Sequence, residues 1–278
     1  MGINNNLHSA IMVPGDNPKL LDKVGSLEAD LYVLNLEDAI SSQNKLKARE
    51  LVCQKLSTLN IPQVVSVRVN ELENGGIEDI LKINKYKPDA IRVPKIQSIE
   101  EVKKVVELVD KDIDIHLTIE TAHALENLKD FKIDSRITTV FLGILDMLES
   151  LKIPQKHLTR ENPLIGYILS KYLFDSRLAG LNHFSFVYQE HQNLEEFQKW
   201  VEYERDIGLT AKTCITPKQV AIANEIFKPS EDEIKKAAII KELFENNSEN
   251  GIHGFVHEDY GFIDEPIYKD ALITLGLN

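Results

Sequence analysis

The chain has 278 residues, 43% of them hydrophobic, which is enough for one large core and does not require two domains. Its 44 acidic and 32 basic residues give a formal net charge of −12, which disfavours a surface for nucleic acid. No apolar run reaches the roughly 18 to 20 residues that cross a bilayer, and the first residues do not resemble a secretory signal, so we expect a cytoplasmic protein without a membrane partner.

Short apolar runs alternate with longer amphipathic stretches up to about residue 228, a pattern typical of repeated βα units. The predicted strands are residues 8–13, 31–36, 64–69, 90–94, 115–120, 138–143, 183–188 and 211–216. Helical periodicity is found between them, for example at residues 19–27, 44–56, 98–109 and 194–208. Eight such units fit a closed (β/α)8 TIM barrel over residues 1–228 better than an open sheet.

A doubly wound open sheet is the alternative architecture. Its usual nucleotide-binding version places a glycine-rich fingerprint after the first strand, where this chain reads VPGDNP at residues 13–18. The barrel is therefore the favoured α/β fold.

Residues 229–278 are expected to form a C-terminal helix and lid extension. Residues 229–246 have a serine cap and an acidic first turn, which predicts a helix. Residues 246–266 are rich in Asn and Gly, and composition leaves open whether they form a mobile flap over the site or a surface tail. A last short helix is expected at residues 269–277.

Polar side chains follow several predicted strands at the point where each strand ends. Because the active site of such a barrel lies at the carboxyl ends of its strands, we expect these side chains to meet on one rim. They are Glu37, Asp38, Arg68, Asn70, Lys95, Glu120 and Asp146.

Glu120 and Asp146 come from neighbouring strands, with no Cys or His beside them, and such an oxygen donor pair suits Mg2+. The alternative is a general acid/base pair of a glycosidase, for which one Trp and 7% aromatic residues supply few sugar platforms. Cys53 and Cys214 lie far apart and the eight histidines have no HExxH spacing, so a disulfide framework or a zinc site is not expected.

Arg68 has two interpretations. A guanidinium binds a carboxylate in two-pronged fashion or stabilises an enolate oxygen, which would make it functional. It also forms structural ion pairs, here with Glu37 or Asp38 as partner.

The chain resembles the citrate lyase beta-subunit-like branch of the HpcH/HpaI aldolases, which includes malyl-CoA and citramalyl-CoA lyases. The resemblance covers nearly the full length. It rests on an ordered set of motifs: MVPGDNPK (12–19), NLEDAISSQNKLKAR (35–49), SVRVN (66–70), VPKI (93–96), IET (119–121), FLGILDM (141–147), ITPKQV (215–220), FKPSEDEI (227–234) and GFIDEP (261–266).

The resemblance implies a (β/α)8 barrel, assembled as a trimer or hexamer, with Mg2+ held by Glu120, Asp146 and water. Arg68 would bind the 2-oxo acid or stabilise an enolate, while Glu37 and Asp38 would support the metal-bound waters.

The resemblance also implies residues that contact substrate. Lys95, with Lys45 or Arg49, would face anionic groups of the substrate, and Asn70 is expected to bind substrate with Arg68 and Lys95. Asp264 matches a catalytic Asp that the family's lid carries into a neighbouring subunit's site.

The chain departs from the family pattern in four places. His8 stands where the family has Arg, Asn35 replaces the first Asp of DLED, and Thr216 replaces a His. Residues 189–193 (QEHQN) replace an acidic pattern, so the substrate is left open.

The expected activity is a Mg2+-dependent carbon–carbon lyase that cleaves or forms a 3-hydroxy-3-carboxy-type acyl-CoA thioester, giving a 2-oxo acid and acetyl-CoA. One alternative is a citrate lyase beta-like subunit acting on a citryl thioester. The other is a metal-binding barrel that has lost lyase activity.

Overall fold

The computed structural model describes residues 7–277. The chain divides into two compact units, Met1–Phe227 and Lys228–Asn278.

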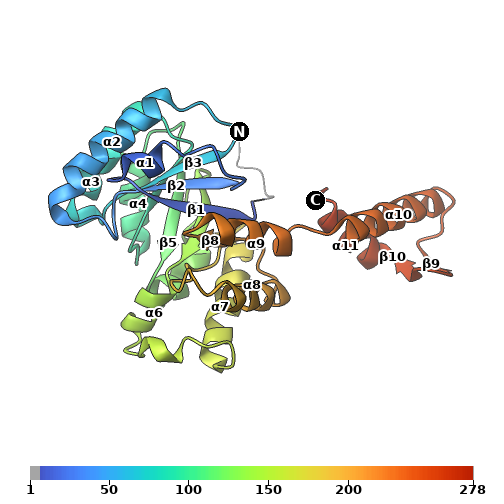
Figure 1. The fold of residues 1–278 in the computed structure, drawn as a ribbon. Coiled ribbons are helices and arrows are strands. Elements are labelled where there is room, and N and C mark those ends of the chain that lie inside the picture. Colours follow the sequence, from blue (N-terminus) through green and yellow to red (C-terminus); the bar gives the residue numbers. More distant parts are fainter. Residues whose placement is uncertain (1–6, 278) are drawn as a thin grey trace. The chain divides into compact units, whose positions relative to one another are not determined.

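Within the described part of the first unit, eight parallel strands form one sheet in the order β7-β6-β5-β4-β3-β2-β1-β8. Figure 1 shows β1, β2 and β3 side by side in this sheet. The strands are β1 (Ser9–Pro14), β2 (Leu31–Asn35), β3 (Val64–Arg68), β4 (Ala90–Val93), β5 (Asp114–Ile119), β6 (Ile137–Leu142), β7 (Asn182–Phe184) and β8 (Lys212–Cys214). Ser185 pairs with Lys212 and joins the two outer strands, so the sheet closes into the predicted TIM barrel.

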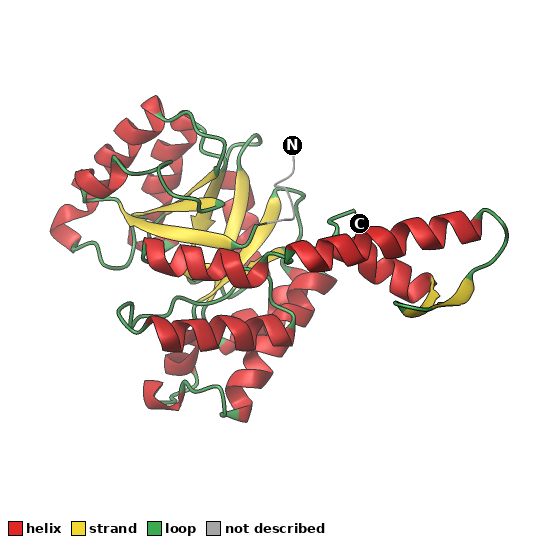
Figure 2. Ribbon diagram, turned by 45° about the vertical axis from the view of Figure 1, so that its right-hand side comes forward, coloured by secondary structure: helices red, strands yellow, loops and turns green. Residues whose placement is uncertain are grey.

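Helices follow the strands and surround the barrel, as Figure 2 shows. They are α1 (Pro18–Leu21), α2 (Lys45–Thr58), α3 (Gly76–Ile83), α4 (Ile99–Leu108), α5 (Ala122–Asn127), α6 (Ile144–Ser150), α7 (Pro163–Leu178), α8 (Leu194–Ile207) and α9 (Pro217–Phe227). A capping box between Ser98 and Glu101 starts α4, which explains why that boundary was predictable.

Side chains alternate between the two faces of each strand, and the two faces differ in chemistry. Outward residues such as Ile11 and Val67 join the large core under the helices. The interior holds a small apolar cluster that includes Val33, Phe141 and Phe184. Polar residues in register with this cluster share the interior: Ser66, Arg92, His116, Thr118 and Thr139.

Two local predictions needed correction. The helix expected at 19–27 ends at Leu21, and the turn after it contains Gly25 with φ +92°, in the left-handed region that suits glycine. The strand expected at 183–188 ends at Phe184, because beyond it only Ser185 pairs with β8.

The second unit has its own small core. It consists of α10 (Glu231–Ser248), the antiparallel hairpin β9 (Gly254–His257) and β10 (Gly261–Asp264), and α11 (Glu265–Thr274). Phe244 and Ile263 are buried together in this core, and Phe244 stacks on Tyr268. The segment that composition described only as flap or tail therefore contains a hairpin, and α11 begins earlier than the predicted 269.

None of the helices within residues 7–277 combines the length and the apolar character needed to span a membrane.

Candidate active site

The loop after β2 is braced from inside by Asn35. Its amide Nδ2 donates to Asp38 O at 2.5 Å, and its Oδ1 accepts from Glu37 N at 3.3 Å. The Lys45 ammonium donates to the carbonyls of Leu36, at 2.9 Å, and Glu37. These bonds hold the carboxylates of Glu37 and Asp38 at the carboxyl end of the barrel. Lys45 therefore binds main-chain carbonyl groups of the loop.

Arg68 lies at the centre of the rim and is 6% exposed. Its Nη2 is 2.6 Å from Glu37 Oε2, 3.1 Å from Asp38 Oδ2 and 3.3 Å from Glu120 Oε1. The structural ion pairs envisaged for Arg68 are therefore present, with a third carboxylate added from β5. A single guanidinium nitrogen is shared among three anions.

Lys95 reaches the same cluster through its main chain and its side chain. Its φ of +55° is left-handed, and its N–H donates to Glu120 Oε2 at 3.0 Å. Its Nζ lies 3.9 Å from Glu37 Oε1. Because a left-handed non-glycine backbone is unfavourable, the rim must hold this turn in place.

Gly143, at the start of α6, allows Glu120 to lie against that helix. A Cβ at residue 143 would be 2.4 Å from Glu120 Cγ and 3.1 Å from its Oε1. Asp146 stands in the first turn of the same helix, and no hydrogen bond or ion pair within residues 7–277 uses its carboxylate. The close packing of Gly143 therefore brings Glu120 to the helix that carries Asp146.

Three of the four rim acids, Glu37, Glu120 and Asp146, have a raised pKa, whereas, despite its partial burial, hydrogen bonds from its neighbours and the charge of Arg68 lower the pKa of Asp38. Burial raises the pKa of Glu37 to about 7, although Arg68 lowers it. Burial also raises the pKa of Glu120, with Asp146 adding to the rise and Arg68 and Arg92 opposing it. The pKa of Asp146 is raised by burial and by Asp38. Crowded, partly desolvated carboxylates of this kind are typical of a functional site.

The donor set at this rim fits a hard divalent cation. Glu120 and Asp146 offer only carboxylate oxygens, and Mg2+ is usually bound by one or two carboxylates with water and substrate completing the shell. No group of three or more acidic, His or Cys side chains with metal-binding geometry occurs in the described chain. Within residues 7–277, Glu120 and Asp146 are therefore the two protein ligands that this rim offers to a metal ion.

Three of the predicted site residues contact groups outside the rim cluster: Asn70, Arg49 and Asp264. Asn70 donates to Asp79 from its N and its Nδ2, at 2.9 and 2.6 Å, and Arg49 Nε pairs with Asp79 at 2.5 Å. Asp264, in the second unit, caps α11 by accepting from Ile267 N at 3.2 Å.

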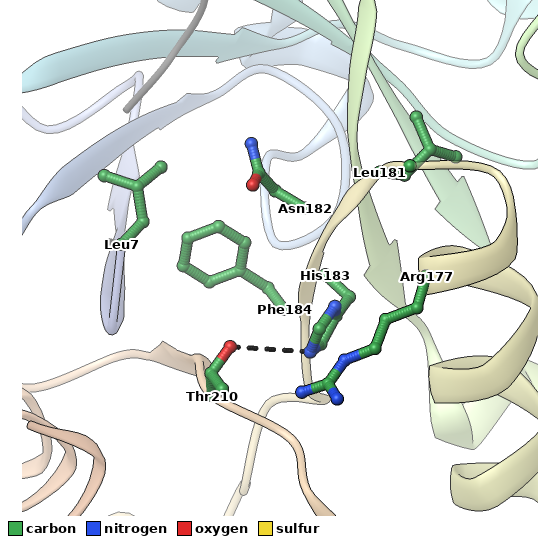
Figure 3. A pocket seen from close by; sticks show the side chains of 8 residues that line it. Leu7, Arg177, Leu181, Asn182, His183, Phe184 and Thr210 are labelled. Carbon is green, nitrogen blue, oxygen red and sulfur yellow. Dashed lines mark hydrogen bonds between the residues drawn. The ribbon is translucent and has the colours of Figure 1, made fainter. Parts of the chain in front are cut away.

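A cavity of about 690 Å³ opens beside the cluster. Asn35, Asp38 and Arg68 line its polar part, and Val13 and Leu27 are among its apolar walls. A smaller cavity of about 320 Å³ lies at the amino ends of the strands, where Arg177 and His183 line it (Figure 3). The larger cavity, at the end where barrel enzymes bind substrate, is the candidate substrate site.

Sequence reasoning missed three contributors to this site. Asn35 was noted only as a replacement of the family's Asp, while its hydrogen bonds show that it braces the loop. Gly143 belongs to the motif FLGILDM, but only its close approach to Glu120 shows that a residue without a side chain is needed there. Arg92 lies inside the barrel, and its position in the strand 90–94 was the available signal.

Fold and site together define a TIM-barrel protein with a rim of carboxylates around a buried arginine and an adjoining cavity. The family model described as HpcH/HpaI aldolase/citrate lyase matches residues 8–217, and the chain belongs to this family. The predicted family is thereby confirmed.

Named relatives are similar in sequence to this chain, and a solved structure shares its fold. A (3S)-malyl-CoA thioesterase of Cereibacter sphaeroides is 29% identical over 87% of this chain and 85% of its own. The human mitochondrial citramalyl-CoA lyase is 25% identical over 97% of this chain and 84% of its own. CitE of Mycobacterium tuberculosis, solved with magnesium, acetoacetate and coenzyme A, superposes with a TM-score of 0.78 at 19% identity, covering 98% of both chains.

Proposed function

We propose that this chain is a Mg2+-dependent carbon–carbon lyase that cleaves or forms a 3-hydroxy-3-carboxy-type acyl-CoA thioester, with a 2-oxo acid and acetyl-CoA as the other reactants. The observation that carries the proposal is the placement of Glu120 against the helix of Asp146, beside Arg68 and a cavity of about 690 Å³. The magnesium, acetoacetate and coenzyme A bound to CitE support it.

In this proposal Glu120 and Asp146 would hold Mg2+, and the bound ion would supply Lewis-acid polarisation of the 2-oxo acid. Arg68 orients the substrate carboxylate and stabilises negative charge on the enolate oxygen that forms as the carbon–carbon bond breaks. Glu37 and Asp38 hold Arg68 in position and would support water molecules bound to the ion. Lys95 and Asn70 contribute to binding the anionic substrate.

We further propose that residues 229–278 act as a lid extension of the barrel of residues 1–228, in a homotrimer or hexamer. Asp264 would then deliver or remove the proton on the carbon next to the thioester in a neighbouring subunit's site. Asp264 is half-buried at the end of β10; its Oδ1 caps α11, and no hydrogen bond or ion pair within residues 7–277 uses its Oδ2, which would be the proton-transferring oxygen.

Thioester hydrolysis is the second candidate function. It is favoured by the similarity to the Cereibacter sphaeroides thioesterase, which covers most of both chains. A hydrolase and a lyase acting on one substrate release different products: free CoA with a hydroxy acid in one case, and acetyl-CoA with a 2-oxo acid in the other.

Incubation of the purified protein and Mg2+ with malyl-, citramalyl- and citryl-CoA tests these activities directly. Release of 2-oxo acid and acetyl-CoA supports the lyase, and Glu120→Ala and Asp146→Ala should each abolish it. Free CoA without 2-oxo acid supports the thioesterase. Turnover of a citryl thioester only with an acyl-carrier partner supports the citrate lyase alternative, and no product from any thioester supports a barrel that has lost activity.

Mixing two inactive variants tests the shared site. Assemblies of Glu120→Ala with Asp264→Asn chains contain some sites with an intact barrel and a neighbour's intact lid. Recovery of turnover on mixing supports a lid that acts between subunits, whereas two variants that stay inactive together contradict it.

A further inference from the structure

Arg92 on β4 points into the barrel, just beneath the rim. Its Nε donates to Thr118 Oγ1 on β5 at 3.0 Å, and its Nη1 lies 3.7 Å from Met12 Sδ on β1. Its guanidinium lies over the Phe141 ring on β6, 3.9 Å from the centroid. Only a side chain inside the barrel contacts three other strands in this way. In the sheet register, Arg92 pairs directly with Arg68.

Arg92 forms no direct ion pair with any described residue, although the carboxylates of Glu120 and Glu37 are near enough to favour its charged form. Within residues 7–277 no ion pair joins it to a carboxylate, whereas Arg68 forms three, and Arg92 is only 4% exposed. Burial lowers its pKa only to about 9, so it stays a cation at neutral pH. A buried charge without an ion-pair partner lowers the stability of the fold, so we expect Arg92 to have a functional role.

The charge balance of the rim indicates that use. Four carboxylates converge there, those of Glu37, Asp38, Glu120 and Asp146, against three cations, those of Arg68, Lys45 and Lys95. When all four carboxylates are ionised, which for Glu37 requires a pH above about 7, the rim alone has one formal negative charge in excess. Arg92 beneath it cancels this excess, and His116 below it adds no cation because burial lowers its pKa to about 3.

We propose that Arg92 sets the ligand preference of the rim, weakening the binding of a divalent cation alone and strengthening the binding of a 2-oxo carboxylate. It acts through its field rather than by contact with the metal, because a buried charge is poorly screened. A neutral rim becomes positive once a divalent ion is bound, which favours the anionic substrate. This inference rests on the proposed Mg2+-dependent function and deepens it.

The test compares wild type with Arg92→Met by titration calorimetry. Methionine is unbranched and suits the space between Met12 and Phe141, and removal of an unpaired charge should not lower Tm. We expect Arg92→Met to bind Mg2+ about tenfold more tightly and pyruvate about tenfold more weakly. Arg92→Lys restores the charge and should return both constants towards wild type.

Tighter Mg2+ binding together with weaker pyruvate binding distinguishes the electrostatic role from damage to the fold, because a distorted rim would weaken the binding of both ligands. Arg177→Met removes the same charge at the amino ends of the strands (Figure 3) and should leave both constants unchanged. Unchanged constants in Arg92→Met, or weaker binding of both ligands, overturn the inference. If wild type binds no Mg2+, the proposed metal function fails, and pyruvate binding without metal then decides the role of Arg92 by itself.

Discussion

Replacement of Gly143 by alanine tests whether the position of Glu120 matters. The new Cβ would lie 2.4 Å from Glu120 Cγ, about 1 Å inside the usual contact distance of about 3.5 Å. The φ of −102° at this residue is open to alanine, so the effect comes from the steric contact. Glu120 must move by roughly 1 Å, which typically costs about 100-fold in rate.

The assay measures Mg2+ affinity, kcat and urea unfolding of Gly143→Ala. We expect Mg2+ binding and turnover to fall by about 100-fold and the free energy of unfolding to fall by about 1–3 kcal/mol. Gly166→Ala in α7 is the matched control, because its Cβ meets only the flexible end of Tyr203, at 3.0 Å, and alanine favours a helix. Wild-type affinity and turnover in Gly143→Ala would refute the reasoning.

Three further predictions concern buried charges and polar bonds. Burial raises the pKa of Glu37 from 4.5 to about 7, so the folded state binds the proton more tightly, and the free energy of unfolding should fall by about 3 kcal/mol as pH rises across that interval. Glu37→Gln should lack this fall in urea titrations at several pH values; an identical slope would contradict the assignment. Glu204 and Lys212 are fully buried, and Lys212 Nζ lies 2.5 Å from Glu204 Oε1. Glu204→Gln leaves the Lys212 ammonium without its anion and should lower the free energy of unfolding, measured in thermal or urea unfolding, by about 3–5 kcal/mol. Adding Lys212→Met should remove most of this loss. Asn35→Asp exchanges the donor to Asp38 O for an acceptor and should lower the free energy of unfolding by about 1–3 kcal/mol; wild-type stability would show that the brace is dispensable.

The site was predictable in outline because parallel strands place their carboxyl ends at one rim. Glu37, Asp38, Arg68, Lys95 and Glu120 do lie there in mutual contact. The contacts of Asn70 and Arg49 with Asp79 were not predictable, because Asp79 lies in α3 and its approach to β3 depends on how that helix packs. The C-terminal hairpin was missed because its Asn- and Gly-rich residues gave no alternating pattern.

The amino-acid sequence by itself determined the eight strands, their order and the family, because strand periodicity, turn residues and motif order are local properties of the chain. Tertiary structure decided how the charges are shared. One nitrogen of Arg68 forms ion pairs with three carboxylates, and Gly143 allows Glu120 to pack against the helix that carries Asp146. Arg92 lies inside the barrel without an ion pair to any described residue. Each of these depends on how the strands pair and curve around the barrel, which brings side chains far apart in sequence within a few ångströms of one another.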